Sequence, residues 1–398
     1  MSEVFSLGDL ASCGTFPSKT QPDPPKAPLT LVQCETCGLV QLAHDFDGDD
    51  LFRQSYGYRS GINEAMVSHL REIAYNVMYR ANFQSGDIVL DIGSNDGTSL
   101  SFYREAKGVR RIGIDPTIAN FKSYYEAGIE TLGDFFTDKN FKSIAGNQKA
   151  KAITSISMLY DLPNPNAFVA DIASTLAPGG LWVFEQSYLP LMVERSSFDT
   201  ICHEHLEYYG MHQINLLLKR HGLRAFDVRV NDVNGGSFQV WACHSDGPHL
   251  TNEAAIDVLL RKEILEGYLG PKPIRALGEI TEAARQRTLA FLEECVSSGK
   301  RVHGYGASTK GNTLLQHFGI TARLLPAIAD RNADKFGSRT PGTSIPIVSE
   351  EESRSAMPDY YFVLPWHFRS GFISREKRFL ERGGKFVFPL PVFEIYPG

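Results

Sequence analysis

The feature that most constrains this chain is an apolar run over residues 87–92, which breaks at a glycine into a polar turn. The sequence over residues 87–98 is Asp-Ile-Val-Leu-Asp-Ile-Gly-Ser-Asn-Asp-Gly-Thr. A short apolar run that ends in glycine and polar residues is typical of a buried strand that presents a small ligand at its carboxyl end in an α/β sheet. We therefore expect this turn to bind a ligand through Asp91, Gly93, Asn95 and Gly97.

The spacing of the glycines narrows the choice of ligand. Gly93 and Gly97 do not complete a G-x-G-x-x-G motif, because the glycine that lets a pyrophosphate approach the backbone is missing. A second expected strand over residues 110–114 ends in Asp115, an acid placed to accept hydrogen bonds from both hydroxyls of a ribose. A nucleoside without a pyrophosphate is favoured, and S-adenosylmethionine fits both facts.

Further strands are expected to follow in the same sheet. Residues 87–243 alternate strand and helix patterns, which predicts a doubly wound sheet, and residues 63–82 predict an amphipathic helix that precedes it. A third strand ends at Asp134, Phe135 and Phe136, which could meet an adenine, although core packing is the commoner fate of phenylalanine. A fourth strand covers residues 152–159. A fifth covers residues 179–187 and places Gln186 at the same edge of the sheet.

A second strand, glycine turn and helix begin near residue 300. Gly304 and Gly306 stand close together, and a lysine follows at the expected start of a helix, which suits a phosphate. We expect a second, nucleotide-like ligand here, bound by Tyr305, Ser308, Lys310 and Asn312, with Trp366 and His367 at the end of a later strand. The two modules are expected to face one cleft. The sequence of residues 251–298, between the two modules, predicts a bridging helical arm.

The densest group of reactive side chains lies at residues 198–209. His203 and His205 are two residues apart, so the H-E-x-x-H pattern of a zinc site is absent. A histidine beside a carboxylate suits proton abstraction at neutral pH, which makes His205 with Glu204 the candidate base. A hydrogen-bonded cap on the surface is the alternative.

The first sixty residues offer weaker signals. Cys34 and Cys37 form half of a zinc ribbon, and no second CxxC completes a tetrahedral site, so zinc and a metal-free turn both stay open. Tyr56 and Tyr58 lie in a segment rich in glycine and could line a polar pocket or tie down a turn.

Composition excludes several classes of protein. A chain of 398 residues has room for two or three domains, and its net charge of -6 argues against nucleic acid or an anionic membrane as a partner. Neither a signal peptide nor an apolar run of about 20 residues is present, so we expect a cytoplasmic protein. Six cysteines without a framework pattern indicate reduced thiols.

Taken together, these motifs resemble the nucleotide-deoxysugar C-methyltransferases, which build branched sugars on nucleotide carriers. The resemblance covers nearly the whole chain. Its motifs are CxxCGLVQL at 34–42, YGY at 56–58, DIGSNDG at 91–97, DFF at 134–136, SFDTICHEH at 197–205, NGGS at 234–237, GYGASTKGN at 304–312 and TPG at 340–342.

The resemblance implies an α/β fold of three parts. These are a small zinc-ribbon-like domain at residues 1–68 that covers the sugar, a Rossmann-like class I methyltransferase domain at residues 69–246, and a second Rossmann-like domain for the nucleotide diphosphate at residues 247–398. It makes His205 the general base and Tyr58 a pocket tyrosine, with Tyr56, His203 and Gln186 on the substrate side.

The implied reaction moves a methyl group from S-adenosylmethionine to a ring carbon, C3, of a nucleotide-linked 4-keto-deoxysugar through an enolate. O-methylation, epimerisation of the keto sugar, and a non-catalytic binding protein are the alternatives. Some members of the family carry a tyrosine three residues before the base and a histidine after the fourth strand, where this chain has Cys202 and Asp161.

Overall fold

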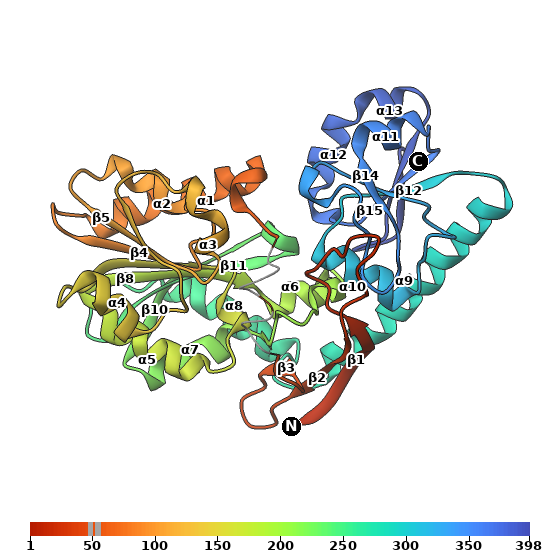
Figure 1. Cartoon of the computed structure of the whole chain (residues 1–398). Helices are drawn as coiled ribbons and strands as arrows, with labels where there is room; N and C mark the ends of the chain where they lie inside the picture. Colours follow the sequence, from red (N-terminus) through yellow and green to blue (C-terminus); the bar gives the residue numbers. More distant parts are fainter. Residues whose placement is uncertain (47–50, 52–56) are drawn as a thin grey trace.

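The computed structural model describes residues 1–46, 51 and 57–398, and it shows two α/β lobes joined by a small antiparallel sheet (Figure 1). The first lobe contains a seven-stranded sheet and the second a six-stranded sheet. The small sheet lies below and between the lobes in Figure 1.

The seven-stranded sheet has the order β10-β11-β8-β7-β4-β5-β6. Its parallel strands are β4 (Ile88–Ile92), β5 (Arg110–Ile114), β6 (Ile129–Leu132), β7 (Ala150–Ile156) and β8 (Leu176–Ser187). The strand β11 (Ser237–His244) runs antiparallel between β8 and β10 (Leu223–Asn231). Because the chain proceeds outward from β4 first on one side and then on the other, the switch point for ligand binding lies between β4 and β7.

Local sequence explains these elements well. The strand β4 is buried at every position, as its apolar run predicts. The predicted helix over residues 63–82 is confirmed as α1 (Glu64–Ala81), where the side chain of Asn63 accepts a hydrogen bond from the Ala65 N–H and so caps the first turn. The other helices of this lobe are α2 (Thr98–Phe102), α3 (Ile118–Phe121), α4 (Asp138–Ala145), α5 (Pro165–Thr175), α6 (Leu189–Glu194) and α7 (Met211–Arg220).

The six-stranded sheet has the order β14-β13-β12-β15-β16-β17. Its strands are β12 (Val302–Tyr305), β13 (Ile328–Asp330), β14 (Ile347–Ser349), β15 (Tyr360–Val363), β16 (Lys385–Phe388) and β17 (Glu394–Tyr396), of which β17 alone among the described strands is antiparallel to its neighbour. Its helices are α10 (Thr309–Phe318), α11 (Glu350–Ser355), α12 (Arg369–Arg375) and α13 (Lys377–Glu381). The predicted helical arm appears as α8 (Glu253–Leu265) and α9 (Lys272–Ser297).

The small sheet joins distant parts of the sequence. It pairs β1 (Ser2–Ala11), β2 (Lys26–Gln33) and β3 (Val40–Leu42) with β9 (Glu207–Tyr208), which comes from the middle of the chain. The expected division between residues 68 and 69 falls inside α1. The domain boundaries therefore stay a proposal.

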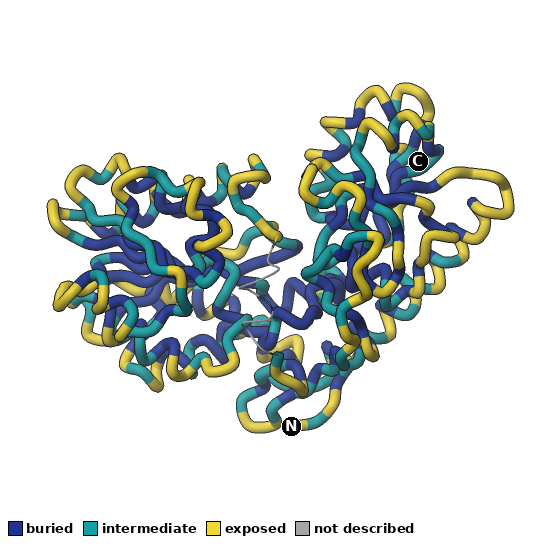
Figure 2. The backbone as a smooth tube through the Cα atoms, in the orientation of Figure 1, coloured by how far each residue is buried: buried dark blue, intermediate teal, exposed yellow. Residues whose placement is uncertain are grey.

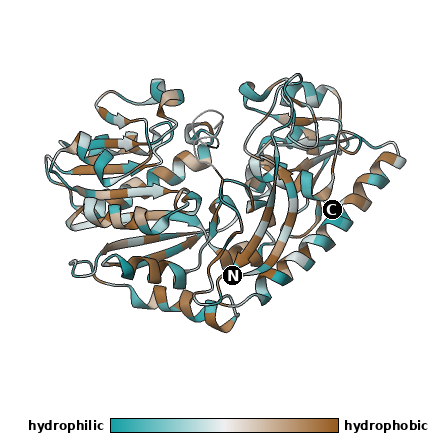
Figure 3. Ribbon diagram, turned by 60° about the horizontal axis from the view of Figure 1, so that its bottom comes forward, coloured by the Kyte–Doolittle hydropathy of each residue, from teal (hydrophilic) through white to brown (hydrophobic). Residues whose placement is uncertain are grey.

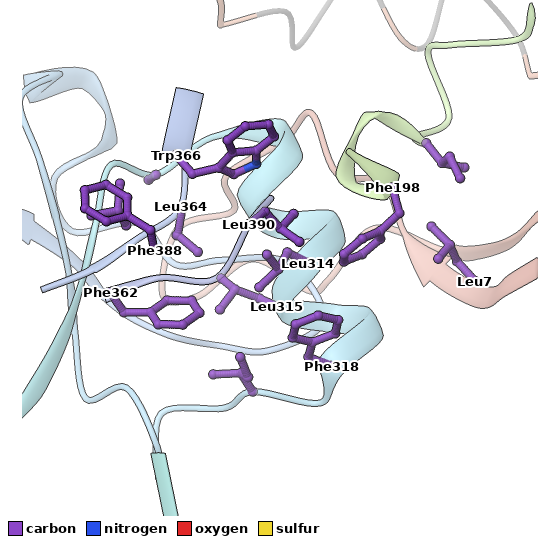
Figure 4. Packing of buried hydrophobic residues seen from close by; sticks show 14 of the residues in the cluster. Leu7, Phe198, Leu314, Leu315, Phe318, Phe362, Leu364, Trp366, Phe388 and Leu390 are labelled. Atoms are coloured by element: carbon purple, nitrogen blue, oxygen red, sulfur yellow. The ribbon is translucent and has the colours of Figure 1, made fainter. Parts of the chain in front are cut away.

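Packing fixes how the parts meet. Both large sheets are buried between solvent-exposed helix faces (Figure 2), and apolar residues concentrate on the strands (Figure 3). One apolar cluster runs from β1 through residues 198–208 into the six-stranded lobe. Within it Phe198 stacks on Phe318 of α10 at 5.3 Å between ring centroids, with Leu7 of β1 nearby (Figure 4). Of the described helices, none is long and apolar enough to cross a membrane.

Candidate active site

A cavity of about 950 Å³ opens between the two lobes. The seven-stranded lobe lines it with the turn after β4 and the segments after β7 and β8. The six-stranded lobe lines it with the turn after β12 and residues 365–375. The carboxyl ends of both parallel sheets therefore face one space, as the sequence predicts, and its size lies at the upper end of ligand-binding pockets.

The turn after β4 supplies one wall. Asp91, Gly93 and Asn95 line the cavity, and Gly93 has a positive φ of 71° that favours glycine. Asp91 is 3% exposed and accepts a hydrogen bond from the Thr154 hydroxyl at 2.6 Å. Burial raises the pKa of Asp91 to about 7, the Thr154 hydrogen bond lowers it, and nearby Asp115 raises it.

Two expected ligand residues, Asp115 after β5 and Gly97 in the turn after β4, support the structure of this turn. Asp115 lies outside the cavity lining, and its carboxylate accepts hydrogen bonds from the Asn95 N–H at 2.7 Å and from the backbone N–H and hydroxyl of Thr117. Gly97 also lies outside the lining, and a Cβ there would stand 2.8 Å from the Tyr125 ring. Both residues shape the turn in this structure.

The expected adenine contacts lie after β6. Phe136 is buried in the core against Phe168, with 5.4 Å between ring centroids, and Asp134 accepts hydrogen bonds from the Phe135 N–H and from Asn140. Asp134, Phe135 and Phe136 are absent from the cavity lining. For Phe136 the structure corrects the expectation, since its ring is core.

His205 lies in the cavity wall between the two turns. Its Nδ1 lies 2.6 Å from the Thr200 carbonyl oxygen, which can only accept, so Nδ1 carries the proton and Nε2 keeps a free lone pair. The ring packs edge-on to Tyr160 at 4.4 Å between centroids. Burial lowers the pKa of His205 to about 4; the Thr200 carbonyl opposes this shift and the charge of Lys310 adds to it. A neutral imidazole with one open nitrogen can accept a proton.

Glu204 does not orient His205, which corrects the expected pairing. Its carboxyl is buried, bonds the Cys202 thiol, and lies so close to Gly14 that a Cβ at that glycine would meet Oε1 at 2.0 Å. Burial raises the pKa of Glu204, and its Oε2 has no hydrogen-bond partner although the residue lines the cavity. The Thr200 carbonyl holds the imidazole instead.

His203 and Gln186 are buried away from the cavity lining. The His203 ring packs edge-on to Phe46, with 4.9 Å between centroids, and within the described part of the chain neither of its nitrogens has a hydrogen-bond partner. The amide of Gln186 is likewise unpartnered. In this structure neither side chain reaches the space that a substrate would occupy.

In the turn after β12, Ser308 and Lys310 line the cavity. The hydroxyl of Ser308 caps α10 by accepting a hydrogen bond from the Gly311 N–H at 3.0 Å. Lys310 donates to the Asn234 carbonyl, and burial lowers the pKa of its ammonium while Asp199 raises it. Lys310 thus carries its charge close to His205.

The sequence suggests that the glycines of this segment allow a phosphate to approach, but packing alone already requires them. A Cβ at Gly306 would stand 2.6 Å from Pro365, and a Cβ at Gly304 would stand 2.6 Å from the Ile328 side chain. Packing between β12 and its neighbours therefore excludes side chains there, whether or not a phosphate approaches.

Four other expected substrate residues divide between cavity and core. His367 lines the cavity, and burial lowers its pKa well below the usual value. Tyr305 is held in the core by hydrogen bonds with Glu350, Glu376 and Arg375. Asn312 donates to the Cys13 carbonyl at 2.8 Å, and the Trp366 indole donates to Asp199 at 2.9 Å. Those three position the lobe and lie outside the lining.

The segment at residues 57–63 lies over the first turn. Tyr58 lines the cavity and is 46% exposed, and its carbonyl accepts a hydrogen bond from the Asn95 amide at 3.0 Å. The N–H of Ser60 donates to the Asn95 side chain at 3.0 Å. Tyr56 lies outside the described residues.

The expected zinc site finds no support. Cys34 and Cys37 stand in the turn between β2 and β3, but the described part of the chain brings together no three His, Cys, Asp or Glu side chains that could hold a metal ion. Hydrogen bonds from the backbone of Cys37 and Thr36 lower the pKa of Cys34.

Comparison with known proteins gives the family. A family model described as a methyltransferase domain matches residues 64–228, and one described as the C-terminal domain of C-methyltransferases matches residues 232–391. The chain is 33% identical to C-methyltransferase NovU of Streptomyces niveus over 365 residues, 92% of this chain and 86% of that protein. This chain belongs to the C-methyltransferase family. It is an S-adenosylmethionine-dependent C-methyltransferase, which sets aside the non-catalytic alternative.

Solved structures resemble parts of this C-methyltransferase. Human N-acetylserotonin methyltransferase in complex with S-adenosylmethionine has a TM-score of 0.34 and 16% identity, covering 46% of this chain and 57% of that one. The plantazolicin methyltransferase BpumL has a TM-score of 0.37 and 12% identity, covering 46% and 87% respectively. The class I methyltransferase fold is assigned from the matched domain and from the strand order of the seven-stranded sheet.

The turn after β4 fits the cofactor of a C-methyltransferase. Asp91 is a buried acid facing the cavity, which the positive charge of S-adenosylmethionine would offset. The Ser99 hydroxyl also lines the cavity and is buried without a hydrogen-bond partner. These two groups and the Gly93 backbone are the residues that would hold the cofactor.

One feature of the enzyme's cavity escaped the sequence analysis. His69 of α1 lines the cavity, and its Nε2 lies 2.6 Å from Oε1 of Glu185. The other carboxylate oxygen of Glu185, Oε2, accepts hydrogen bonds from Asn231 and Gln239. Burial opposes ionisation of His69, but Glu185 prevails and raises its pKa. His69 lies on the helix stripe that predicts core, so no local pattern marks it. Asp161 also lines the cavity.

Proposed function

We propose that this enzyme methylates C3 of a nucleotide-linked 4-keto-deoxysugar. The observation that carries the proposal is the neutral, half-buried His205, whose Nε2 is free in the wall of a cavity that both lobes line. The likeness to NovU and the sequence motifs support a sugar substrate. The turn after β12, with Ser308 and Lys310, is proposed to take the nucleotide diphosphate.

The ketone is the physical reason for carbon methylation. It acidifies the hydrogen on the adjacent carbon, so a positioned base can remove that proton and leave a nucleophilic enolate carbon. S-adenosylmethionine supplies an electrophilic methyl group on its sulfonium when bound. His205 takes the proton on Nε2, while the Thr200 carbonyl holds the Nδ1 proton in place.

Lys310 is suited to stabilise the enolate. Its ammonium belongs to a side chain in the cavity wall, and its charge adds to the larger effect of burial in lowering the pKa of His205. Negative charge that develops on the ketone oxygen during proton removal would be attracted to the same ammonium in this low-dielectric site. Protonation of His205 and formation of the enolate are therefore coupled.

Product analysis with a methyl-labelled cofactor tests the reaction. The purified enzyme is incubated with a nucleoside diphosphate 4-keto-6-deoxyhexose, and the label is located by NMR. Label on C3 supports the proposal. Label on oxygen would identify an O-methyltransferase, and an unlabelled epimer would identify an epimerase.

The base is tested separately by exchange of the substrate proton with deuterium oxide in the presence of S-adenosylhomocysteine. His205→Asn keeps an amide that can donate to the Thr200 carbonyl and removes Nε2, so exchange and methylation should both fall by about 10²–10⁴-fold. His221→Asn, on a solvent-facing histidine of the same lobe, is the matched control. Exchange at the unmodified rate in the His205 variant would refute the assignment.

A further inference from the structure

His69 lines the cavity, and the proposed reaction does not use it. It lies on α1, whose apolar side packs on one face of the seven-stranded sheet, and its Nε2 contacts Oε1 of Glu185 on β8 at 2.6 Å. The Glu185 side chain is 1% exposed and the His69 side chain 15% exposed. The histidine, and not the acid beneath it, therefore presents a surface that a ligand can reach.

The hydrogen bonds around Glu185 fix the direction of its bond with His69. Oε2 of Glu185 accepts from the Asn231 amide at 2.9 Å and from the Gln239 amide at 3.1 Å. The Trp241 indole, which can donate but not accept, holds the Gln239 carbonyl oxygen, so the amide nitrogen of Gln239 faces Glu185. Two N–H donors on one oxygen favour an ionised carboxylate. Nε2 of His69 therefore carries a proton and donates it to Oε1.

The second ring nitrogen of His69 is open. Nδ1 has no hydrogen-bond partner among the described residues and is not shielded from solvent. Burial lowers the pKa of His69, but Glu185, and then Glu72 on the next turn of α1, outweigh burial and raise this pKa. An imidazolium carries a proton on each nitrogen, so Nδ1–H is a positively charged donor in the cavity wall.

Two other bases of this lobe line the cavity among the described residues, Arg59 and His205. The guanidinium of Arg59 stacks on the Tyr124 ring at 3.6 Å, and its Nε lies 3.5 Å from Asp96. His205 is neutral, because burial lowers its pKa to about 4. Of these three bases, His69 is thus the one that combines a positive charge with an unoccupied donor.

The sheet places this donor close to the turn after β4. Asp91 pairs with Thr154 of β7, and Glu185 pairs with Ile156, two residues further along the same strand. Side chains two residues apart point to the same face of a sheet, so both acids lie on the face that α1 covers. The methionine part of S-adenosylmethionine carries an ammonium and a carboxylate on one carbon. The acid Asp91 and the donor on His69 have the charges that match these two groups.

We propose that His69 binds the carboxylate of the methionine part of S-adenosylmethionine through its Nδ1–H, and that Glu185 positions the ring for this contact. Imidazolium and carboxylate form a charge-assisted hydrogen bond. The inference rests on the use of S-adenosylmethionine, which membership of the family establishes, and not on the sugar proposed above. Its failure would leave the proposed function standing.

Calorimetry with two forms of the cofactor isolates the contact. S-adenosylmethionine and decarboxylated S-adenosylmethionine, which lacks the carboxylate alone, are each titrated into the full-length enzyme without a sugar substrate. The unmodified enzyme should bind S-adenosylmethionine about 10–100-fold more tightly, as expected for one charge-assisted hydrogen bond. In His69→Gln, whose amide can still donate to Glu185, this preference should disappear. The affinity for the decarboxylated form should stay within about twofold, because the lost contact is one that this form never makes.

His69→Asn tests the opposite half of the arrangement. Its amide stands near the position of Nδ1 and does not reach Glu185, so it should keep part of the preference. His221→Gln, on a solvent-facing histidine outside the cavity lining, is the matched control. Because the preference is a ratio of two affinities for one protein sample, a loss of folded protein affects both measurements alike and cannot imitate the result.

Three results would each overturn the assignment. One is an unmodified enzyme that binds both forms of the cofactor equally well. Another is an equal loss of affinity for both forms in His69→Gln, which is the outcome of a purely structural role. The third is a greater loss of preference in His69→Asn than in His69→Gln, which would make the Glu185 contact, and not the Nδ1 donor, the important one.

Discussion

At the scale of single residues, the proposed base is a neutral histidine. A group whose pKa in the folded state lies near 4 instead of 6.5 stays deprotonated until the pH falls well below its ordinary range. Since kcat/KM reports ionisations of the free enzyme, its acid limb at saturating cofactor should lie near pH 4. The unfolded chain takes up this proton near pH 6.5, so the free energy of unfolding should fall as the pH drops from 6.5 towards 4, and less so in His205→Asn. Rapid assays and urea titrations across this window measure both, and an acid limb near 6.5 would contradict the buried neutral state.

At the scale of elements, the turn that joins β12 and α10 contains a glycine that is required by packing. Gly306 has a φ of 82°, and a Cβ there would overlap Pro365. Gly306→Ala should therefore lower the free energy of unfolding by about 3 kcal/mol, from backbone strain and overpacking together. Gly319, at the other end of α10, has a φ of 71° and open space around it, so Gly319→Ala isolates the strain and should cost about 1 kcal/mol. Urea unfolding compares the two. Equal losses, with thymidine diphosphate binding abolished only in Gly306→Ala, would show that the ligand and not Pro365 requires the glycine.

At the scale of the whole molecule, the segment that carries His205, the proposed base, is held by packing between the lobes. Phe198 is fully buried against α10, and the Thr313 hydroxyl of that helix donates to the Ile201 carbonyl at 3.2 Å. Phe198→Ala should destabilise the protein by about 3–5 kcal/mol and also displace His205 relative to the turn after β12. Phe141→Ala removes an equally buried ring from within the seven-stranded lobe. At a temperature where both variants remain folded, kcat/KM should fall by about 10²-fold in the first and little in the second. Similar losses in both would show that the lobe interface does not position the base.

The sequence by itself determined the local units. The apolar run of β4, the amphipathic stripe of α1 and the second strand, turn and helix at β12 and α10 are all read from neighbouring residues, because periodicity and caps act over a few positions. The same patterns placed Asp91, Gly93, Asn95, His205, Ser308, Lys310 and His367 in the cavity wall. Strand ends carry ligand residues in such sheets, so this much follows from order along the chain.

Only the tertiary structure decided which of these groups act on one another. Glu204 precedes His205 in the sequence, yet in the fold its side chain faces Cys202 and Gly14. The orientation of the imidazole is fixed by the Thr200 carbonyl instead. The imidazole of His69 contacts the Glu185 carboxylate across a separation in sequence that no spacing rule covers. Side-chain partners and burial come from the packing of distant elements, and burial in turn lowers the pKa of His205.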